Sequence, residues 1–240
     1  MNIIEKINAK QDLYNNKPVT IAFLGDSVTH GCFECYIRQD DNIETFFEYK
    51  NAYSTRLQEI LHMMYPQVQI NIINSGISGD SAPRGFARLE RDVLSYHPDL
   101  VVVCYGLNDM CGGMAGLPRY REHLEKIFAD VQESGAELIF MTPNMACTDV
   151  SRQLTEEKLI NCGKLVSGLQ NDGTMDAYMD AARSVCTEMG VKLVDHYAIW
   201  KKMQENGVYI TDMLSNKLNH PLREWHYYMA IKLIEAMFEV

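Results

Sequence analysis

A serine and a histidine in distant parts of the chain have the residue types that ester chemistry needs. Ser27 follows an apolar run and a Gly-Asp pair, and a serine in such a strand-to-helix turn can expose its hydroxyl. A serine there is often only a helix N-cap, so a nucleophile also needs a base. His220 suits that role because it lies in a polar loop directly before Pro221 and a helical pattern. The pair predicts nucleophilic catalysis, with Ser27 attacking and His220 accepting its proton.

Small, polar and glycine-rich turns follow three successive apolar runs of the sequence. These turns span residues 25–29, 74–81 and 106–109. Glycine allows backbone N–H groups to come close to a ligand, so turns of this composition are candidates for a binding site.

Five apolar runs are the predicted strands that carry these turns. They span residues 19–24, 68–73, 100–105, 137–142 and 191–194. Helical patterns separate them, at residues 52–64, 84–96, 118–134, 172–189 and 222–238. This alternation predicts the α/β class, as a three-layer α/β/α sandwich with a central five-stranded parallel sheet. Sites in such sheets lie at the carboxyl ends of the strands, where the polar turns fall.

The motifs resemble those of a known family, the SGNH (GDSL-like) hydrolases. Residues 23–31, which contain the Gly-Asp-Ser sequence, are similar to the first block of that family. Residues 74–81 and 106–109 resemble the second and third blocks, and His220 resembles the general base of the last one. The blocks follow one another in the family's order.

The resemblance implies a flavodoxin-like sandwich and a metal-free serine esterase that needs no cofactor. In such an enzyme Ser27 is the nucleophile. The oxyanion hole is then formed by the backbone N–H groups of Ser27 and Gly79 and by the side chain of Asn108. Asp26 and Asp109 flank these residues, and we expect them to support the turns by accepting hydrogen bonds.

The last block departs from the family pattern. The family usually has an aspartate three residues before the histidine, whereas this chain has Lys217, which cannot accept a hydrogen bond from imidazole. The acceptor must come from elsewhere, since triads are defined by geometry. Asp212 is the first choice, because its loop can fold back towards His220. Asp195 is the second choice, and a Ser–His dyad oriented by a backbone carbonyl is the third.

Composition narrows the classes of function. Among 240 residues, Lys and Arg total 22 and Asp and Glu total 32, and the net charge of −10 argues against nucleic-acid binding. No apolar run reaches the roughly 20 residues of a membrane span. The first residues lack a signal-peptide pattern, so we expect a cytoplasmic protein. No linker or repeat interrupts the sequence, so residues 1–240 are expected to form one domain. The sequence does not determine its oligomeric state, for which a homodimer is one option.

Other features have a structural and a functional interpretation. The seven cysteines, including the CxxC of Cys32 and Cys35, are expected to be free and inert thiols. Arg84 and Arg88 have helical spacing and are expected on an exposed helix face. The aromatic-rich segment 32–53 could cap the site and stack on a sugar, form a dimer contact, or be a packed loop.

The predicted function is hydrolysis of small O-acyl esters. Acetylated carbohydrates are favoured, because many members of the family that the chain resembles deacetylate sugars. A lysophospholipase or thioesterase is the alternative within the same chemistry. A non-catalytic flavodoxin-like domain, which binds an anion at its helix N-termini, is the alternative of another class. The negative net charge favours a neutral substrate over a polyanionic one.

Overall fold

A central sheet of five parallel strands organises the molecule. The structure is a computed structural model, and it describes residues 1–9 and 14–239. The strands lie in the order β4-β1-β5-β6-β7, and all neighbours are parallel. Their bounds are Val19–Gly25 for β1, Ile70–Gly76 for β4, Leu100–Cys104 for β5, Glu137–Met141 for β6 and Lys192–Val194 for β7. The predicted α/β fold with a five-stranded parallel sheet is confirmed.

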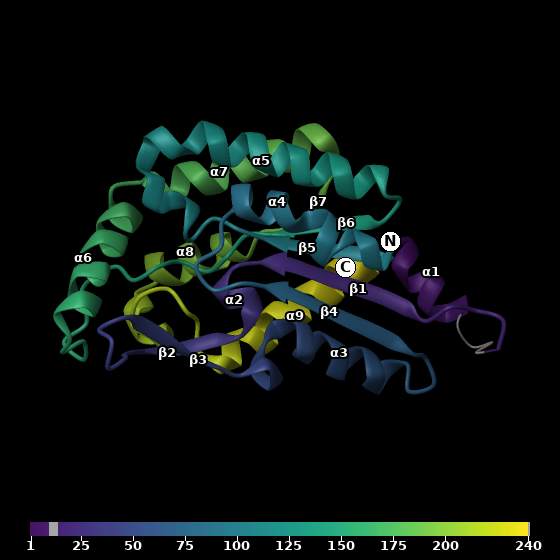
Figure 1. Ribbon diagram of the computed structural model, residues 1–240, viewed down its shortest axis with the longest axis horizontal. Coiled ribbons are helices and arrows are strands. Elements are labelled where there is room, and N and C mark those ends of the chain that lie inside the picture. The colour runs from purple at the N-terminus through teal and green to yellow at the C-terminus, as the bar shows by residue number, and fades with distance from the viewer. Residues whose placement is uncertain (10–13, 240) are drawn as a thin grey trace.

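Helices cover both faces of this sheet (Figure 1). On one face α3 (Tyr53–Met64) packs against α9 (Arg223–Phe238). On the other face α5 packs against both α4 and α7, with bounds Gly113–Glu133, Ala82–Asp92 and Thr174–Met189. Every residue of β5 is buried between the layers, which explains its continuous apolar sequence. None of the described helices is both long and apolar enough to cross a membrane.

Several elements were not predicted from the sequence. They are α1 (Asn2–Ala9), the antiparallel hairpin of β2 (Cys32–Ile37) and β3 (Ile43–Phe47), α6 (Glu157–Asn171) and α8 (His196–Glu205). Figure 1 shows the hairpin and α6 at the end of the sheet towards which the strand arrows point. Both elements therefore lie where the polar turns emerge.

The parallel register brings the first polar turns to the same level. Gly25 of β1 pairs with Gly76 of β4 on one side and with Cys104 of β5 on the other. From β1 the chain continues to β4 on one side of β1, and from there to β5 on the other side. The strand order therefore reverses between β1 and β5, which is the position where ligands bind in open α/β sheets. Turns that are far apart in the sequence thus meet at one point.

Two histidines outside the predicted site are buried in the core. His196 accepts a hydrogen bond from the indole N–H of Trp200 at 2.8 Å, and His226 accepts one from the backbone N–H of Tyr53 at 3.2 Å. Burial lowers the pKa of both imidazoles to about 3. They are neutral core residues because their helices pack against large aromatic side chains.

Candidate active site

The turn after β1 positions the hydroxyl of Ser27. Ser27 is the first residue of the short helix α2, and Asp26 caps this helix by accepting the backbone N–H of Val28 at 3.0 Å. Gly25 is required because a Cβ there would lie 2.1 Å from a side-chain oxygen of α2. The N–H of a first helical residue has no partner inside the helix, so that of Ser27 is available to a ligand.

The imidazole of His220 contacts this hydroxyl. Its Nε2 lies 2.9 Å from Ser27 Oγ, and its Nδ1 lies 2.7 Å from the carbonyl oxygen of Phe33. A carbonyl can only accept, so Nδ1 carries the proton and Nε2 is free to accept the hydroxyl proton of Ser27. The structure therefore brings together the two residues that the sequence predicted as nucleophile and base.

Asp212 does not orient His220, so this part of the prediction is wrong. Its side chain is 61% exposed and lies 3.3 Å from Nζ of Lys217. Asp212 is thus paired with the residue that replaces the family's usual aspartate. The backbone carbonyl of Phe33, on β2, takes the position expected of an acidic side chain.

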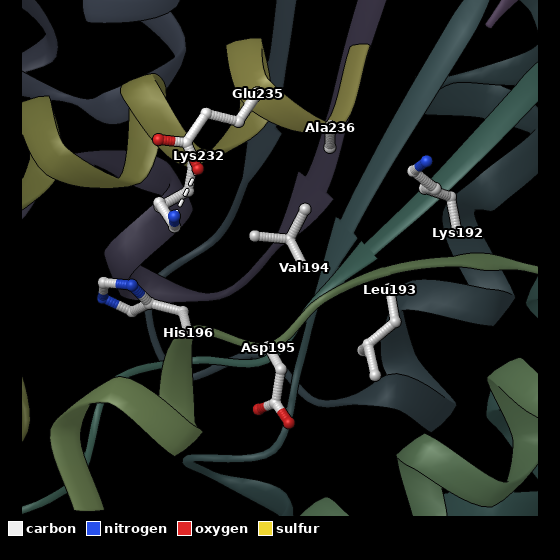
Figure 2. A pocket seen from close by; sticks show the side chains of 8 residues that line it. All are labelled: Lys192, Leu193, Val194, Asp195, His196, Lys232, Glu235 and Ala236. Carbon is white, nitrogen blue, oxygen red and sulfur yellow. Dashed lines mark hydrogen bonds and ion pairs between the residues drawn. The ribbon is translucent and has the colours of Figure 1, made fainter. Parts of the chain in front are cut away.

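Asp195, the second choice, belongs to a different part of the molecule. It caps α8 by accepting the N–H of Ala198 and pairs with Arg183 at 2.8 Å. It lies at a separate pocket of about 190 Å³, where its carboxylate is directed away from α9 (Figure 2). That pocket is lined by Lys192, Leu193, Val194, Asp195, His196, Lys232, Glu235 and Ala236. It contains neither Ser27 nor His220.

Replacing Asp212 by asparagine is expected to leave kcat and the pH profile of ester hydrolysis unchanged, because its carboxylate faces Lys217 and solvent. The measurement is steady-state hydrolysis of p-nitrophenyl acetate. His220→Gln, which removes the imidazole, is the matched control and should lose turnover. A loss in Asp212→Asn comparable to that of His220→Gln would show that Asp212 reaches the imidazole during catalysis.

Asn216 holds the loop that carries His220. Its Nδ2 donates to Asn219 Oδ1 at 3.0 Å and to Cys35 Sγ at 3.5 Å. Its Oδ1 accepts three backbone N–H groups, those of Leu218 at 3.0 Å, Asn219 at 2.9 Å and His220 at 2.9 Å. The sequence analysis missed this residue, although a buried asparagine in a polar loop is suited to satisfying several N–H groups.

Asn216→Ala is expected to lower kcat by about 10²-fold, since displacing a catalytic group by about 1 Å has an effect of that size. The alanine leaves three backbone N–H groups without their acceptor, which allows His220 to move from Ser27. Asn216→Asp keeps the acceptor oxygen and should retain more activity. Equal kcat values for wild type and folded Asn216→Ala would show that Asn216 does not position His220.

Gly79 and Asn108 line the same pocket as Ser27. Gly79 has a φ of +77°, a left-handed conformation that favours glycine. Nδ2 of Asn108 donates to the carbonyl of Asp80 at 2.8 Å, which fixes the amide beside the Gly79 turn. The predicted oxyanion-hole residues Ser27, Gly79 and Asn108 thus all line one pocket.

His30 supports the turn before Gly79. Its Nδ1 accepts the backbone N–H of Ser78 at 3.2 Å, and its Nε2 lies 2.8 Å from the hydroxyl of Tyr49. The ring also packs against Phe47 of the hairpin, with ring centroids 4.7 Å apart. His30 thus connects the hairpin to the Ser78–Gly79 turn.

Arg88 is not on an exposed helix face, contrary to the prediction. Its side chain is 8% exposed and donates to Oδ2 of Asp80 through Nε at 2.9 Å and Nη2 at 2.6 Å. It also donates to the carbonyls of Ser75 and Gly25 and to the hydroxyl of Tyr105. One guanidinium thus connects the turns after β1 and β4 with the end of β5.

Two carboxyl groups flank the site residues in the chain: Asp26 is buried and Asp109 is half-buried. Asp109 accepts the N–H of Ala82, at the start of α4, at 2.9 Å, and Asp26 caps α2. Burial raises the pKa of each to about 7, and the repulsion between neighbouring carboxylates acts in the same direction. These groups are partly protonated near neutral pH, so the site is less negative than its number of carboxyl groups suggests.

The pocket above Ser27 has a volume of about 270 Å³. The hairpin, α6 and the His220 loop contribute lining residues, so part of the 32–53 segment lies at the site. Glu44 is the one acidic or basic side chain besides His220 among its described lining residues. Four of its lining residues are apolar: Ile43, Leu165, Val166 and Leu218. In the part of the chain that the structure describes, no three His, Cys, Asp or Glu side chains are placed to hold a metal ion.

The pH dependence of the base follows from its burial. Burial lowers the pKa of His220 from 6.5 to about 4, which the Phe33 carbonyl and the charge of Glu34 only partly oppose. Imidazole acts as a base only when neutral, so this function is lost as the pH falls through about 4. An NMR titration, with His220→Gln to assign the signal, measures this pKa. A midpoint near 6.5 would contradict the expected shift.

The α/β/α fold and the Ser27–His220 pair together define the class of serine acyl hydrolases. The sequence profile of the GDSL-like Lipase/Acylhydrolase family matches residues 23–226. The chain therefore belongs to this family of carboxylic ester hydrolases, and the predicted membership is confirmed.

Similar proteins include several acetylxylan esterases. One from Geobacillus stearothermophilus is 24% identical over 186 residues, which are 76% of this chain and 78% of that protein. The crystal structure of Axe2, an acetylxylan esterase from the same organism, is 21% identical with a TM-score of 0.66 and covers 91% of this chain and 94% of its own. The acetyl xylan esterase AlAXEase is 20% identical with a TM-score of 0.65, at 91% and 99% coverage. Two further Axe2 structures are catalytic mutants, one at a serine and one at a histidine.

Proposed function

We propose that the protein hydrolyses small O-acetyl esters of neutral carbohydrates through an acyl-enzyme on Ser27. The observation that carries this proposal is the 2.9 Å contact between Ser27 Oγ and an imidazole nitrogen whose tautomer is fixed by the Phe33 carbonyl. This geometry prepares the hydroxyl to lose its proton as it attacks.

The steps follow from the positions of these groups. Ser27 Oγ attacks the ester carbonyl while His220 Nε2 takes its proton. The N–H groups of Ser27 and Gly79 and the amide of Asn108 stabilise the oxyanion, and loss of one such donor typically lowers kcat by about 10²–10³-fold. His220 then protonates the leaving alkoxide, and water releases the acetyl group by the same route.

The substrate class is inferred from the pocket and from the relatives. A pocket with Glu44 as its one acidic side chain offers no cation to a phosphate or a free carboxylate. Its 270 Å³ exceeds what an acetyl group alone fills, which leaves room for part of the alcohol. Relatives described as acetylxylan esterases support an acetylated sugar.

The test is a substrate panel. Acetylated xylosides and p-nitrophenyl acetate are expected to be hydrolysed with higher kcat/KM than p-nitrophenyl octanoate, a lysophospholipid or an acyl-thioester. Four apolar lining residues favour the alternative of a lysophospholipase or thioesterase: Ile43, Leu165, Val166 and Leu218. A kcat/KM that rises with acyl length would therefore replace the acetyl-ester proposal by that alternative.

A further inference from the structure

The solvent-accessible cysteines gather at one place in the fold. Four of the seven cysteines are buried, namely Cys32, Cys104, Cys147 and Cys186. The other three all line the pocket that contains Ser27 and His220: Cys35, Cys111 and Cys162. They come from β2, from the 3-10 turn Asp109–Gly112 and from α6, so only the folded chain brings them to one pocket.

We propose that Cys35, Cys111 and Cys162 form a site of covalent thiol modification by small, uncharged disulfides, and that modification there blocks the ester pocket. In this step the sulfur of a cysteine attacks one sulfur of the reagent. A new S–S bond joins protein and reagent half, the S–S bond of the reagent breaks, and the other half leaves as a thiol with the cysteine's proton. The blocking of ester turnover rests on the proposed function, whereas the modification itself does not.

Access to solvent, and not acidity, distinguishes these thiols. Burial raises the pKa of Cys35 and Cys111, so both are protonated near neutral pH and react slowly. Burial also raises the pKa of Cys32, Cys147 and Cys186 to about 12, and solvent does not reach these three thiols. An uncharged reagent is specified because Glu44 lines the pocket and the chain carries a net charge of −10.

Modification blocks the pocket because the space is limited. The pocket measures about 270 Å³, and a pyridylthio group bound to any of its walls occupies a large part of that volume. The Sγ of Cys35 also accepts a hydrogen bond from Asn216, the residue that holds the His220 loop. A group attached to Cys35 therefore displaces Asn216 as well as filling space.

The experiment treats the native protein with dithiodipyridine and identifies the modified cysteines by peptide mass spectrometry. We expect modification at the three pocket cysteines before the four buried ones, with a parallel loss of p-nitrophenyl acetate hydrolysis that dithiothreitol reverses. Prior reaction of Ser27 with a bulky fluorophosphonate should slow the modification. Early modification of buried cysteines, or an unchanged rate after phosphonylation, would overturn the proposal.

Variants test the consequence for turnover. The triple variant Cys35→Ser/Cys111→Ser/Cys162→Ser should have the same esterase activity before and after dithiodipyridine treatment. The control Cys186→Ala should lose the same fraction of its activity as the wild type. Equal fractional loss in the triple variant would overturn the proposal. If the triple variant does not fold, each single variant should lose one modified peptide from the map. Because the peptide map needs no turnover, absence of esterase activity would reject the proposed function and leave this test intact.

Discussion

Ser27→Ala is expected to lower kcat on acetyl esters by about 10⁴- to 10⁶-fold, the range found when a serine hydrolase loses its nucleophile. The alanine removes the oxygen that lies 2.9 Å from His220 Nε2 and leaves the turn otherwise intact, since Asp26 still caps α2. Steady-state hydrolysis of p-nitrophenyl acetate measures the loss. Circular dichroism and urea unfolding show whether the variant remains folded.

A fluorophosphonate probe gives a second measure of the same residue. It should modify the wild type and the control Ser75→Ala, because the Ser75 hydroxyl donates to the carbonyl of Asp92 on α4. Ser27→Ala should remain unmodified. A folded Ser27→Ala that keeps turnover or reacts with the probe would show that another residue is the nucleophile.

Arg88→Gln is expected to reduce the free energy of unfolding by about 3–5 kcal/mol, as typically follows when one partner of a buried ion pair is removed. The carboxylate of Asp80 is 3% exposed and would lose the two N–H donors that Arg88 directs at it. The carbonyl of Asp80 also holds Asn108, so kcat should fall together with stability. The urea midpoint and kcat are the two measurements.

Arg91 provides the matched control on the same helix. Its side chain is 75% exposed and pairs with Asp92 at 2.6 Å, so Arg91→Gln should leave the urea midpoint close to that of the wild type. The double variant Arg88→Met/Asp80→Asn should regain part of the lost stability, because no buried charge remains unpaired, but not the lost kcat. If Arg88→Gln unfolds at the same urea concentration as Arg91→Gln, the buried pair of Arg88 and Asp80 does not stabilise the fold.

The sequence predicted those parts of the fold that local pattern determines. The central strands β1 and β5 are apolar runs because both of their faces are buried, and this pattern is visible without the structure. The hairpin was missed because β2 mixes buried and exposed positions without strict alternation. Its register also shifts between Cys32 and Cys35, which removes the regular period.

The candidate site was predictable where side-chain identity carries the chemistry. Ser27, Gly79, Asn108 and His220 follow motifs. The parallel register brings the turns of Ser27, Gly79 and Asn108 together, and all four residues line one pocket. A backbone carbonyl was only the third choice for the partner of His220. The residue that supplies it was not predictable, because a backbone carbonyl is present at every residue and has no signature in the sequence. Arg88 was placed at the surface because helical spacing does not reveal which face meets the turns of another strand.

The acceptor for His220 also affects how this enzyme can change. A catalytic aspartate is lost by a single codon change, whereas the Phe33 carbonyl survives any substitution at its own position that leaves the strand in place. The vulnerable points lie instead in what holds β2 against the His220 loop. Arg223 is one such point, because it pairs with Glu34 at 2.7 Å and with Glu48, and lies 4.4 Å from the Phe33 ring centroid. In this chain, the support of His220 should therefore be lost through substitutions in the hairpin or at Arg223, and not through substitutions in the catalytic motifs.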